Sequence, residues 1–390
     1  MSSSDASKRQ TANALFAVAF FFWFSQYAYA SYINPVLLES GASATFMGFV
    51  GGMYGFVQLA LRIPVGIAAD RYNKQKFFVV LGCVLSLIAA LGMMISTAPV
   101  SVLVFRTIGG VACCSWVCHT VLYSRYFTSS ESSGRITQLN TGSYFGRLGS
   151  YVAVALLVSL FDMRIAFAVG FAGALISLAL CAKVENVGSD KPPVSLSAYL
   201  SVMKEKNLLI CSGLGILVQF VAFGTEYSFA TNVQVALGAT AQQVSYFSIA
   251  LLVPSIIANY IVGRMILQKR SPKAILCFGM ALMTAYCLLT PRVTQLWQFY
   301  PVQALAGIGN SCTIAVLLGQ CVRNVPAQSR STAMGFFQAA YAIGLSAGPS
   351  FMGIAIDHFD YRLSFDLMAL IAVVTIVLSV RFLKEERASA

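Results

Sequence analysis

The chain has 390 residues, of which 58% are hydrophobic and only 10% are charged. A soluble protein carries about 25% charged residues, so this composition excludes a water-soluble globular domain and indicates a protein of the lipid bilayer. The formal net charge of +12 would suit a nucleic-acid partner, but the basic residues stand singly or in small groups between apolar runs. We therefore expect no nucleic-acid partner.

Twelve apolar runs follow one another along the chain, each near the roughly 20 residues that a helix needs to cross the hydrocarbon core. The first six lie at Thr11–Leu38, Ala44–Ala69, Phe77–Ser96, Ser101–Tyr123, Ile136–Leu160 and Ile165–Val184. The second six lie at Leu208–Ala230, Val244–Leu267, Ala274–Thr290, Gln295–Gln320, Thr332–Ile356 and Leu363–Leu383. The sequence therefore predicts an all-α membrane protein with twelve transmembrane helices.

The basic residues between these runs predict the orientation. With the N-terminus inside, the inner loops and tails hold 20 Lys and Arg residues, and the outer loops hold only Arg164, Arg292 and Arg362. Cytoplasmic loops of membrane proteins carry the excess of positive charge. Both termini are therefore predicted to be cytoplasmic.

The two halves of the chain resemble each other. Residues 161–167 (FDMRIAF) recur at 359–365 (FDYRLSF), and residues 26–31 match residues 226–231 at nearly the same offset. The polar stretch 185–207 divides the chain almost in half, so we predict six-helix bundles at residues 1–184 and 208–390 with a cytoplasmic linker between them. Two six-helix repeats insert in parallel, and transporters of that kind bind substrate near the midplane between their halves.

The sharpest local motif follows the second run and comprises Gly66, Asp70, Arg71, Lys74 and Lys76. Gly66 would let two helices approach closely. Asp70, at a helix end, would bind backbone groups or pair with a neighbouring Arg. We interpret this charged cluster as a gate that holds one conformation closed on the inner side.

This motif resembles the signature loop of the major facilitator superfamily. Arg106 with Gly110 resembles the family's fourth-helix motif, and residues 344–349 (GLSAGP) resemble its Gly-xxx-Gly-Pro motif. The resemblance covers essentially the whole chain. It implies a secondary transporter in which two six-helix halves alternate access to a central site.

Three departures from the family pattern matter. Asn73 stands where the family has Gly, and the second-half loop from Gly263 to Lys273 lacks the Asp. The fifth run reads GSYFGR at residues 142–147 and lacks the Gly-Pro form of the family's antiporters. The last departure favours uptake over export.

Ionisable residues inside apolar runs are costly and need a partner or a wet cavity. Arg147, near the middle of the fifth run, is predicted to bind an anionic substrate or a coupling carboxylate, with an interhelical ion pair as the alternative. Glu226 is predicted to carry a proton, unless it reaches the outer water. Arg106 and His119 are further proton-coupling candidates, each with a packing or hydrogen-bonding alternative. Arg62, ahead of Pro64, is assigned to gating or structure.

Aromatic and polar residues alternate near the end of the first run. Gln26, Tyr27 and Tyr29 form a polar aromatic stripe, and Glu226 with Tyr227 occupies the matching place in the seventh run. The resemblance places the first and seventh helices at the cavity, so these five residues are candidates for substrate binding beside Arg147. Rings and hydroxyl groups suit an organic solute, whereas core packing is the alternative for each ring.

Together these features predict a monomeric secondary transporter of a small organic anion, driven by proton symport. A drug or metabolite exporter of the same fold is the alternative. No soluble domain suits a receptor, no catalytic constellation suits an enzyme, and no phosphate-binding loop suits an ATPase. The ten cysteines form no CxxC pair, so we expect no metal and no cofactor. Short loops favour a bacterial inner membrane.

Overall fold

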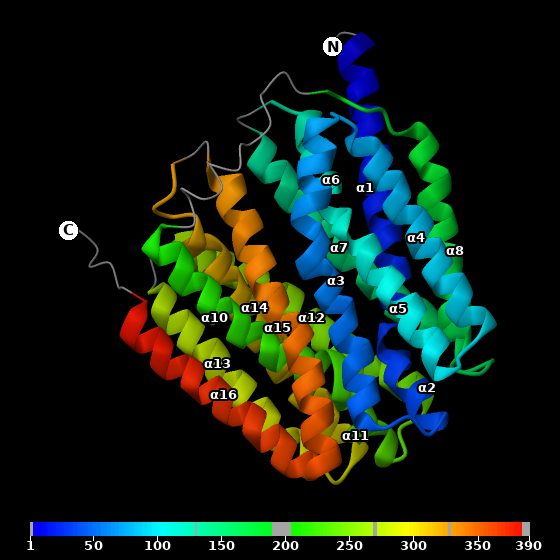
Figure 1. The fold of residues 1–390 in the computed structure, drawn as a ribbon, viewed down its shortest axis with the longest axis vertical. Coiled ribbons are helices and arrows are strands. Elements are labelled where there is room, and N and C mark those ends of the chain that lie inside the picture. Colours follow the sequence, from blue (N-terminus) through cyan, green and yellow to red (C-terminus); the bar gives the residue numbers. More distant parts are fainter. Residues whose placement is uncertain (1–2, 129–130, 189–203, 268–270, 327–328, 384–390) are drawn as a thin grey trace. The chain divides into compact units, whose positions relative to one another are not determined.

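The computed structural model describes residues 3–128, 131–188, 204–267, 271–326 and 329–383 (Figure 1). Helices make up the secondary structure of these residues, among which no strand occurs. Eleven helices in the described part are long and apolar enough to cross a membrane. The chain is therefore an all-α, multi-pass membrane protein. Most of the predicted linker, residues 189–203, lies outside the described residues.

The fifth predicted run is the one that falls short of these criteria. It forms α7 (Ser132–Leu157), which is 26 residues long but is not among the eleven apolar helices. Arg135, Asn140 and Arg147 all lie on this helix and lower its hydropathy. The number of twelve spans, like the cytoplasmic position of both termini, stays a prediction.

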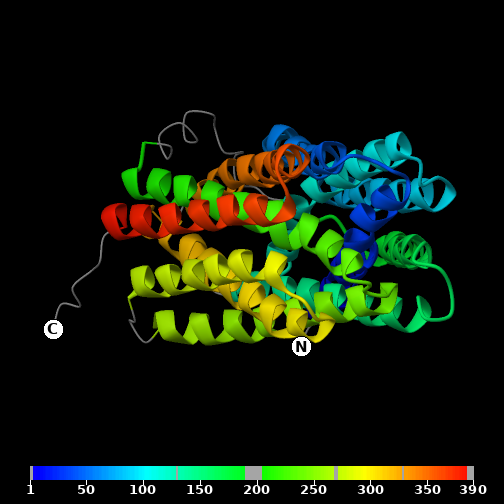
Figure 2. The same ribbon diagram turned by 90° about the horizontal axis from the view of Figure 1, so that it is seen from below.

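The helices gather into two compact units. The first unit contains α1 (Ser3–Ala28), η1 (Ala30–Tyr32), α4 (Gln75–Ile95), α5 (Pro99–Cys114), α6 (Trp116–Arg125), α7, α8 (Ile165–Leu180) and η2 (Cys181–Lys183). The second contains α10 (Lys206–Gly224), η3 (Thr225–Phe229), α11 (Ala230–Ala236), α12 (Ala241–Leu267), α13 (Pro272–Leu289), η4 (Thr290–Arg292), η5 (Leu296–Gln298), α14 (Phe299–Cys321), α15 (Arg330–His358) and α16 (Tyr361–Phe382). Figure 2 shows the helices of the second unit, coloured green to red, lying along one another.

Two helices cross the boundary of this grouping. The short α2 (Ile33–Glu39) ends just past it, and α3 (Ala44–Arg71) is shared, with residues 44–59 grouped with the second unit and residues 60–71 with the first. The predicted division at residues 185–207 is a division of the sequence repeat, and as a domain boundary it stays a prediction.

The first and seventh predicted spans are both interrupted near their repeat-related residues. After α1, the chain makes the 3-10 turn η1 before α2 continues the span. Pro35 in α2 has no N–H group to donate to the carbonyl of Ser31, which favours this break. In the seventh span, the π-helical turn η3 (Thr225–Phe229) separates α10 from α11. Irregular turns of this kind occur often at functional sites, and Glu226 lies in this one.

The first half of α3 packs very closely on α15 within the second unit. A Cβ atom at Gly55 would lie 2.6 Å from the carbonyl carbon of Leu345, and one at Gly52 would lie 2.7 Å from the carbonyl oxygen of Ser346. At the start of α3, the Asp357 carboxylate accepts hydrogen bonds from the backbone N–H groups of Ala44 and Thr45, at 3.1 and 2.8 Å. The N-terminus of α3 is thus capped by the end of α15.

Candidate transport site

Arg147 lies on α7 among three aromatic rings of the first unit. Its guanidinium carbon is 4.5 Å from the ring centre of Trp23, 4.3 Å from that of Tyr27 and 5.1 Å from that of Tyr144. Rings attract a cation that is placed over their faces. We call these four residues the Arg147 cluster; it holds a half-buried positive charge in a fixed, apolar setting.

The predicted polar aromatic stripe of α1 divides between two faces of the helix. Trp23 and Tyr27 are four residues apart and share the face toward Arg147. Gln26, on another face of α1, and Tyr29, which follows the last residue of α1, are both buried. Gln26 Nε2 donates to Ser86 Oγ at 2.9 Å, and Tyr29 OH donates to Gln26 Oε1 at 3.5 Å. Their hydrogen bonds are internal, so the geometry favours packing over substrate contact for Gln26 and Tyr29.

Glu226 is buried on η3 in the second unit. Asn310 Nδ2, on α14, donates a hydrogen bond of 2.5 Å to Glu226 Oε1 and lies 3.4 Å from the hydroxyl of Tyr227. Within the described part of the chain, Glu226 Oε2 accepts no hydrogen bond. We call Glu226, Tyr227 and Asn310 the Glu226 cluster. Burying a carboxylate charge with one strong donor is costly, and this cost favours a functional role for Glu226 over a purely structural one.

The other predicted proton-coupling residues differ in their surroundings. His119 is fully buried on α6, with Nδ1 3.0 Å from the carbonyl oxygen of Ser115 and its ring 5.2 Å from that of Phe22. These contacts favour the packing alternative for His119. Arg106 is half-buried on α5, and Arg62 is buried on α3.

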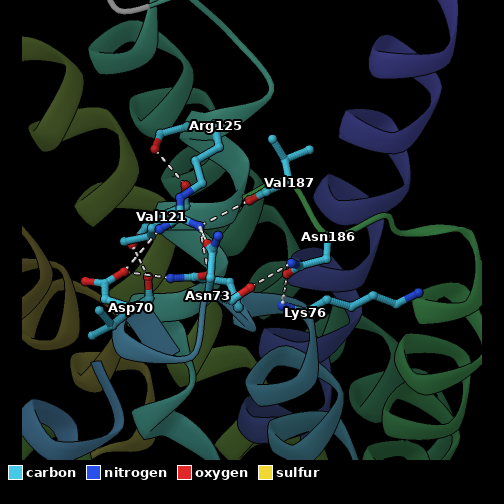
Figure 3. A network of polar contacts seen from close by, with 11 residues as sticks. Asp70, Asn73, Lys76, Val121, Arg125, Asn186 and Val187 are labelled. Carbon is cyan, nitrogen blue, oxygen red and sulfur yellow. Dashed lines mark hydrogen bonds and ion pairs between the residues drawn. The ribbon is translucent and has the colours of Figure 1, made fainter. Parts of the chain in front are cut away.

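The predicted gate is built around Asp70, as Figure 3 shows. Arg125 Nη2, at the end of α6, lies 3.1 Å from Asp70 Oδ1, and Gln75 Nε2 donates to the same oxygen at 2.6 Å. Arg125 Nη1 also donates to Asn73 Oδ1, Gln75 Oε1 and the carbonyl oxygen of Val187 at 3.0, 2.8 and 3.1 Å. We call Asp70, Asn73, Gln75 and Arg125 the Asp70 network. One guanidinium thus joins three segments of the first unit.

The network explains the departure at position 73. Asn73 has φ +52°, in the left-handed region that glycine occupies most readily and that Asn tolerates better than most residues. Its own carbonyl oxygen accepts from Asn186 Nδ2 at 2.9 Å, and Asn186 Oδ1 accepts from the backbone N–H of Lys76 at 3.0 Å. Asn73 therefore keeps the turn that a Gly would allow and adds a side-chain acceptor for Arg125.

The remaining motif residues lie outside this network. Arg71 and Lys74 are exposed, and the Lys76 side chain points away from the network in Figure 3. A Cβ atom at Gly66 would meet only Val117 Cγ1, at an ordinary contact distance of 3.6 Å. The very close helix approach expected at Gly66 is therefore not seen at that position in the described residues. On the same helix, Gly52 and Gly55 do approach the backbone of α15 that closely.

Sequence reasoning missed several partners that complete these clusters. In the sequence, Arg125 is one of the 20 basic residues of the inner loops and tails, and Asn310, Tyr144 and Trp23 are polar or aromatic residues within apolar runs. The signal for Asn310 is its amide inside a span, which is costly to bury without a partner. Among the described residues, no group of three His, Cys, Asp or Glu side chains is placed to hold a metal.

Comparisons with known proteins agree with this architecture. The family profile of the Major Facilitator Superfamily matches residues 15–230 and 213–390. The chain belongs to the major facilitator superfamily, and it is a membrane transporter rather than an enzyme.

The relatives that match in sequence include two MFS-type transporters and a multidrug resistance protein. The chain is 20% identical to the MFS-type transporter MJ1560 of Methanocaldococcus jannaschii over 366 residues, which cover 89% of this chain and 91% of that one. It is 27% identical to the MFS-type transporter YfiU of Bacillus subtilis over 46% of this chain, and spans only 33% of that relative's length. Multidrug resistance protein 2 of the same species is 23% identical over 47% of this chain and 46% of its own length.

Solved structures share the fold at low sequence identity. A bacterial homolog of the human lysosomal transporter Spinster superposes with a TM-score of 0.78 at 15% identity, covering 98% of this chain and 99% of that one. The nucleoside transporter NupG gives 0.75 at 15% identity over 97% and 100% of the two chains. A POT family transporter, solved with a thioalcohol-conjugated peptide, gives 0.77 at 14% identity over 98% and 100%.

Proposed function

We propose that this transporter takes up a small organic anion by alternating access, in symport with protons, as a monomer in a bacterial inner membrane. The observation that carries the proposal is the Arg147 cluster. An arginine keeps its charge at every physiological pH, so Arg147 is a permanent cation within the fifth predicted span. A carboxylate bound there would be stabilised by charge-assisted hydrogen bonds.

The rings around Arg147 add a second requirement on the solute. Tyr27 and Tyr144 are half-buried rather than fully enclosed, so part of each ring is accessible to a ligand. An organic anion with a flat or apolar portion would pack on the rings while its carboxylate meets the guanidinium. A bare inorganic ion would use the charge alone.

Proton coupling is assigned to the Glu226 cluster. Glu226 is buried and holds one strong hydrogen bond, from Asn310, to one of its two oxygens. Binding a proton removes the buried charge, and losing it restores the charge. A carboxyl group in this setting is suited to couple its protonation to the exposure of its span to one side of the membrane.

The Asp70 network is assigned to gating. The Arg125 guanidinium joins α6 to α3, to α4 and to the backbone of Val187, so breaking its contacts would free several segments at once. The ion pair is only partly exposed, so salt screens it less than a fully exposed pair. Arg62 and the exposed residues Arg71 and Lys74 stay predicted gating residues.

The second candidate function is export of drugs or metabolites by proton antiport. It is favoured by the similarity to Multidrug resistance protein 2 over part of the chain. The fifth span, however, lacks the Gly-Pro form that marks antiporters of the family. Cells that express the protein separate the two functions, because export predicts resistance to toxic compounds and uptake predicts accumulation of a labelled carboxylate.

The central proposal is tested at Arg147. Small carboxylates are screened by thermal shift on the purified protein, and the best binder is then measured with Arg147→Ala and Arg147→Lys. Loss of a buried charge partner costs about 2–5 kcal/mol, so Arg147→Ala should weaken binding by roughly 30-fold or more, with Arg147→Lys between. Arg164→Ala, in an exposed loop, is the matched control. Unchanged binding by a folded Arg147→Ala protein would refute an anionic substrate.

A further inference from the structure

One face of the second unit carries an apolar groove that the proposed transport cycle does not use. Both α12 and α13 pack along α14, and a groove of about 710 Å³ lies between them. Its walls include Ile257 and Ile261 from α12 and Phe278 from α13, and Ile308 of α14 lies in its floor. The groove is therefore a feature of three helices within one unit.

The groove walls are exposed as well as apolar. Ile257, Ile261 and Phe278 are 54%, 49% and 57% exposed in the structure. In a membrane-spanning helix, such surface is solvated by lipid chains rather than by water. The concave shape distinguishes it from an ordinary lipid-facing helix surface, because a chain lying in it would be contacted from both sides and from below.

The length of the groove is close to the hydrocarbon thickness of one membrane leaflet. Its residues on α12 run from Pro254 to Met265, which is about 16 Å at a rise of 1.5 Å per residue. Half of the hydrocarbon core is about 15 Å thick. A single acyl chain of one leaflet therefore fits along it.

Positive charge gathers at one end of the groove. Arg264 is exposed next to the lining residue Met265, with its guanidinium carbon 4.7 Å from the ring centre of Tyr260. Lys273 follows the lining residue Ser271, at the N-terminus of α13, where the helix dipole is also positive. No Asp or Glu occurs anywhere in the sequence between Glu226 and Asp357. The end of the groove is thus complementary to an anion.

From this combination we propose that the groove holds an acyl chain of an anionic phospholipid, with the headgroup against Arg264 and Lys273. The apolar groove provides the chain site, and the two basic residues select the headgroup. The proposal concerns a lipid-binding surface and is independent of the transported solute.

The test uses the full chain in bilayers of phosphatidylglycerol or phosphatidylcholine with dibrominated acyl chains, which quench nearby tryptophan. Phe278→Trp reports on the groove, and the signal of wild-type protein with its three native tryptophans is subtracted. Val377→Trp on α16 is the matched reporter, because Val377 is 58% exposed and lies four residues from Arg381 but outside the groove. Each basic residue near a lipid surface contributes roughly a fivefold preference for anionic lipid.

We expect bound phosphatidylglycerol to be preferred about tenfold or more at Phe278→Trp, and clearly less at Val377→Trp. Adding Arg264→Gln and Lys273→Gln should remove the preference at Phe278→Trp, whereas Arg381→Gln should leave it. Native mass spectrometry gives a second readout, with one phosphatidylglycerol lost in the double variant. Equal quenching by both lipids would show ordinary bulk lipid, and absence of quenching would show that protein, such as a second copy, covers the groove; either result overturns the proposal.

Discussion

The repeat-related segments of the first and seventh spans carry different chemistry. In the first unit, α1 supplies aromatic rings to a cation on another helix, Arg147. In the second unit, the corresponding segment carries the ionisable group itself, Glu226, and receives an amide donor from Asn310. The repeat thus preserves the position of a polar cluster while changing which charge it holds.

This difference suggests a division of labour. The guanidinium of Arg147 stays charged throughout a transport cycle, so it suits a permanent attraction for a substrate. The carboxyl group of Glu226 can change its charge, so it suits coupling to a proton gradient. The following variants test whether the two clusters can be separated in this way.

The largest effect is expected from Glu226→Gln, which keeps the shape of the side chain but cannot bind and release a proton. In proteoliposomes with a pH gradient, accumulation of the solute should be lost, whereas exchange of labelled for unlabelled solute should continue. Glu205→Gln, at the start of α10, serves as the control. Accumulation at the wild-type level would show that the proton travels by another route.

A smaller effect is expected from Tyr27→Leu in the Arg147 cluster. A cation–π contact contributes about 0.5–2 kcal/mol, so the dissociation constant of the anion should rise roughly 2- to 30-fold. Tyr27→Phe keeps the ring and should bind nearly as well as wild type. Equal losses in both variants would mean that the hydroxyl group, rather than the ring face, acts on the ligand.

Asp70→Asn provides a reference outside both clusters. A partly exposed ion pair is worth up to about 1 kcal/mol, so turnover should fall by roughly fivefold because the balance of conformations changes. The substrate KM and the pH coupling should stay near wild type. Asp162→Asn, which removes an exposed loop pair, should leave all three quantities unchanged. A selective rise in KM for Asp70→Asn would argue against a gating role.

The smallest effect on transport is expected from Gln26→Leu, at the repeat position of Glu226. The substitution removes the acceptor of the buried Tyr29 hydroxyl group and leaves Ser86 with its contact to Ser25 Oγ at 3.1 Å. Loss of the partner of a buried polar group costs about 1–3 kcal/mol of the free energy of unfolding. Thermal unfolding should report that loss, while the dissociation constant of the anion stays the same. Weaker binding of the anion at unchanged thermal stability would show instead that Gln26 contributes to substrate binding.

Much of the architecture is readable from local sequence. Hydropathy locates the spans because each must replace water by lipid along its own length, and the family match confirms the superfamily that the Asp70 loop indicated. The same reasoning marks Arg147 and Glu226, since a charge in an apolar run stands out without knowledge of its neighbours. It overestimates the apolar character of α7, whose polar residues keep it from the eleven apolar helices.

The partners within each unit are decided only by tertiary structure. Trp23 and Arg147, Glu226 and Asn310, and Asp70 and Arg125 come from distant parts of the chain, and hydropathy does not record which helix faces which. On α1, adjacent residues point about 100° apart, so Gln26 and Tyr27 belong to different environments although they are neighbours in sequence. Composition along the chain determined that charges are buried in the membrane; helix rotation and packing decided what each charge meets.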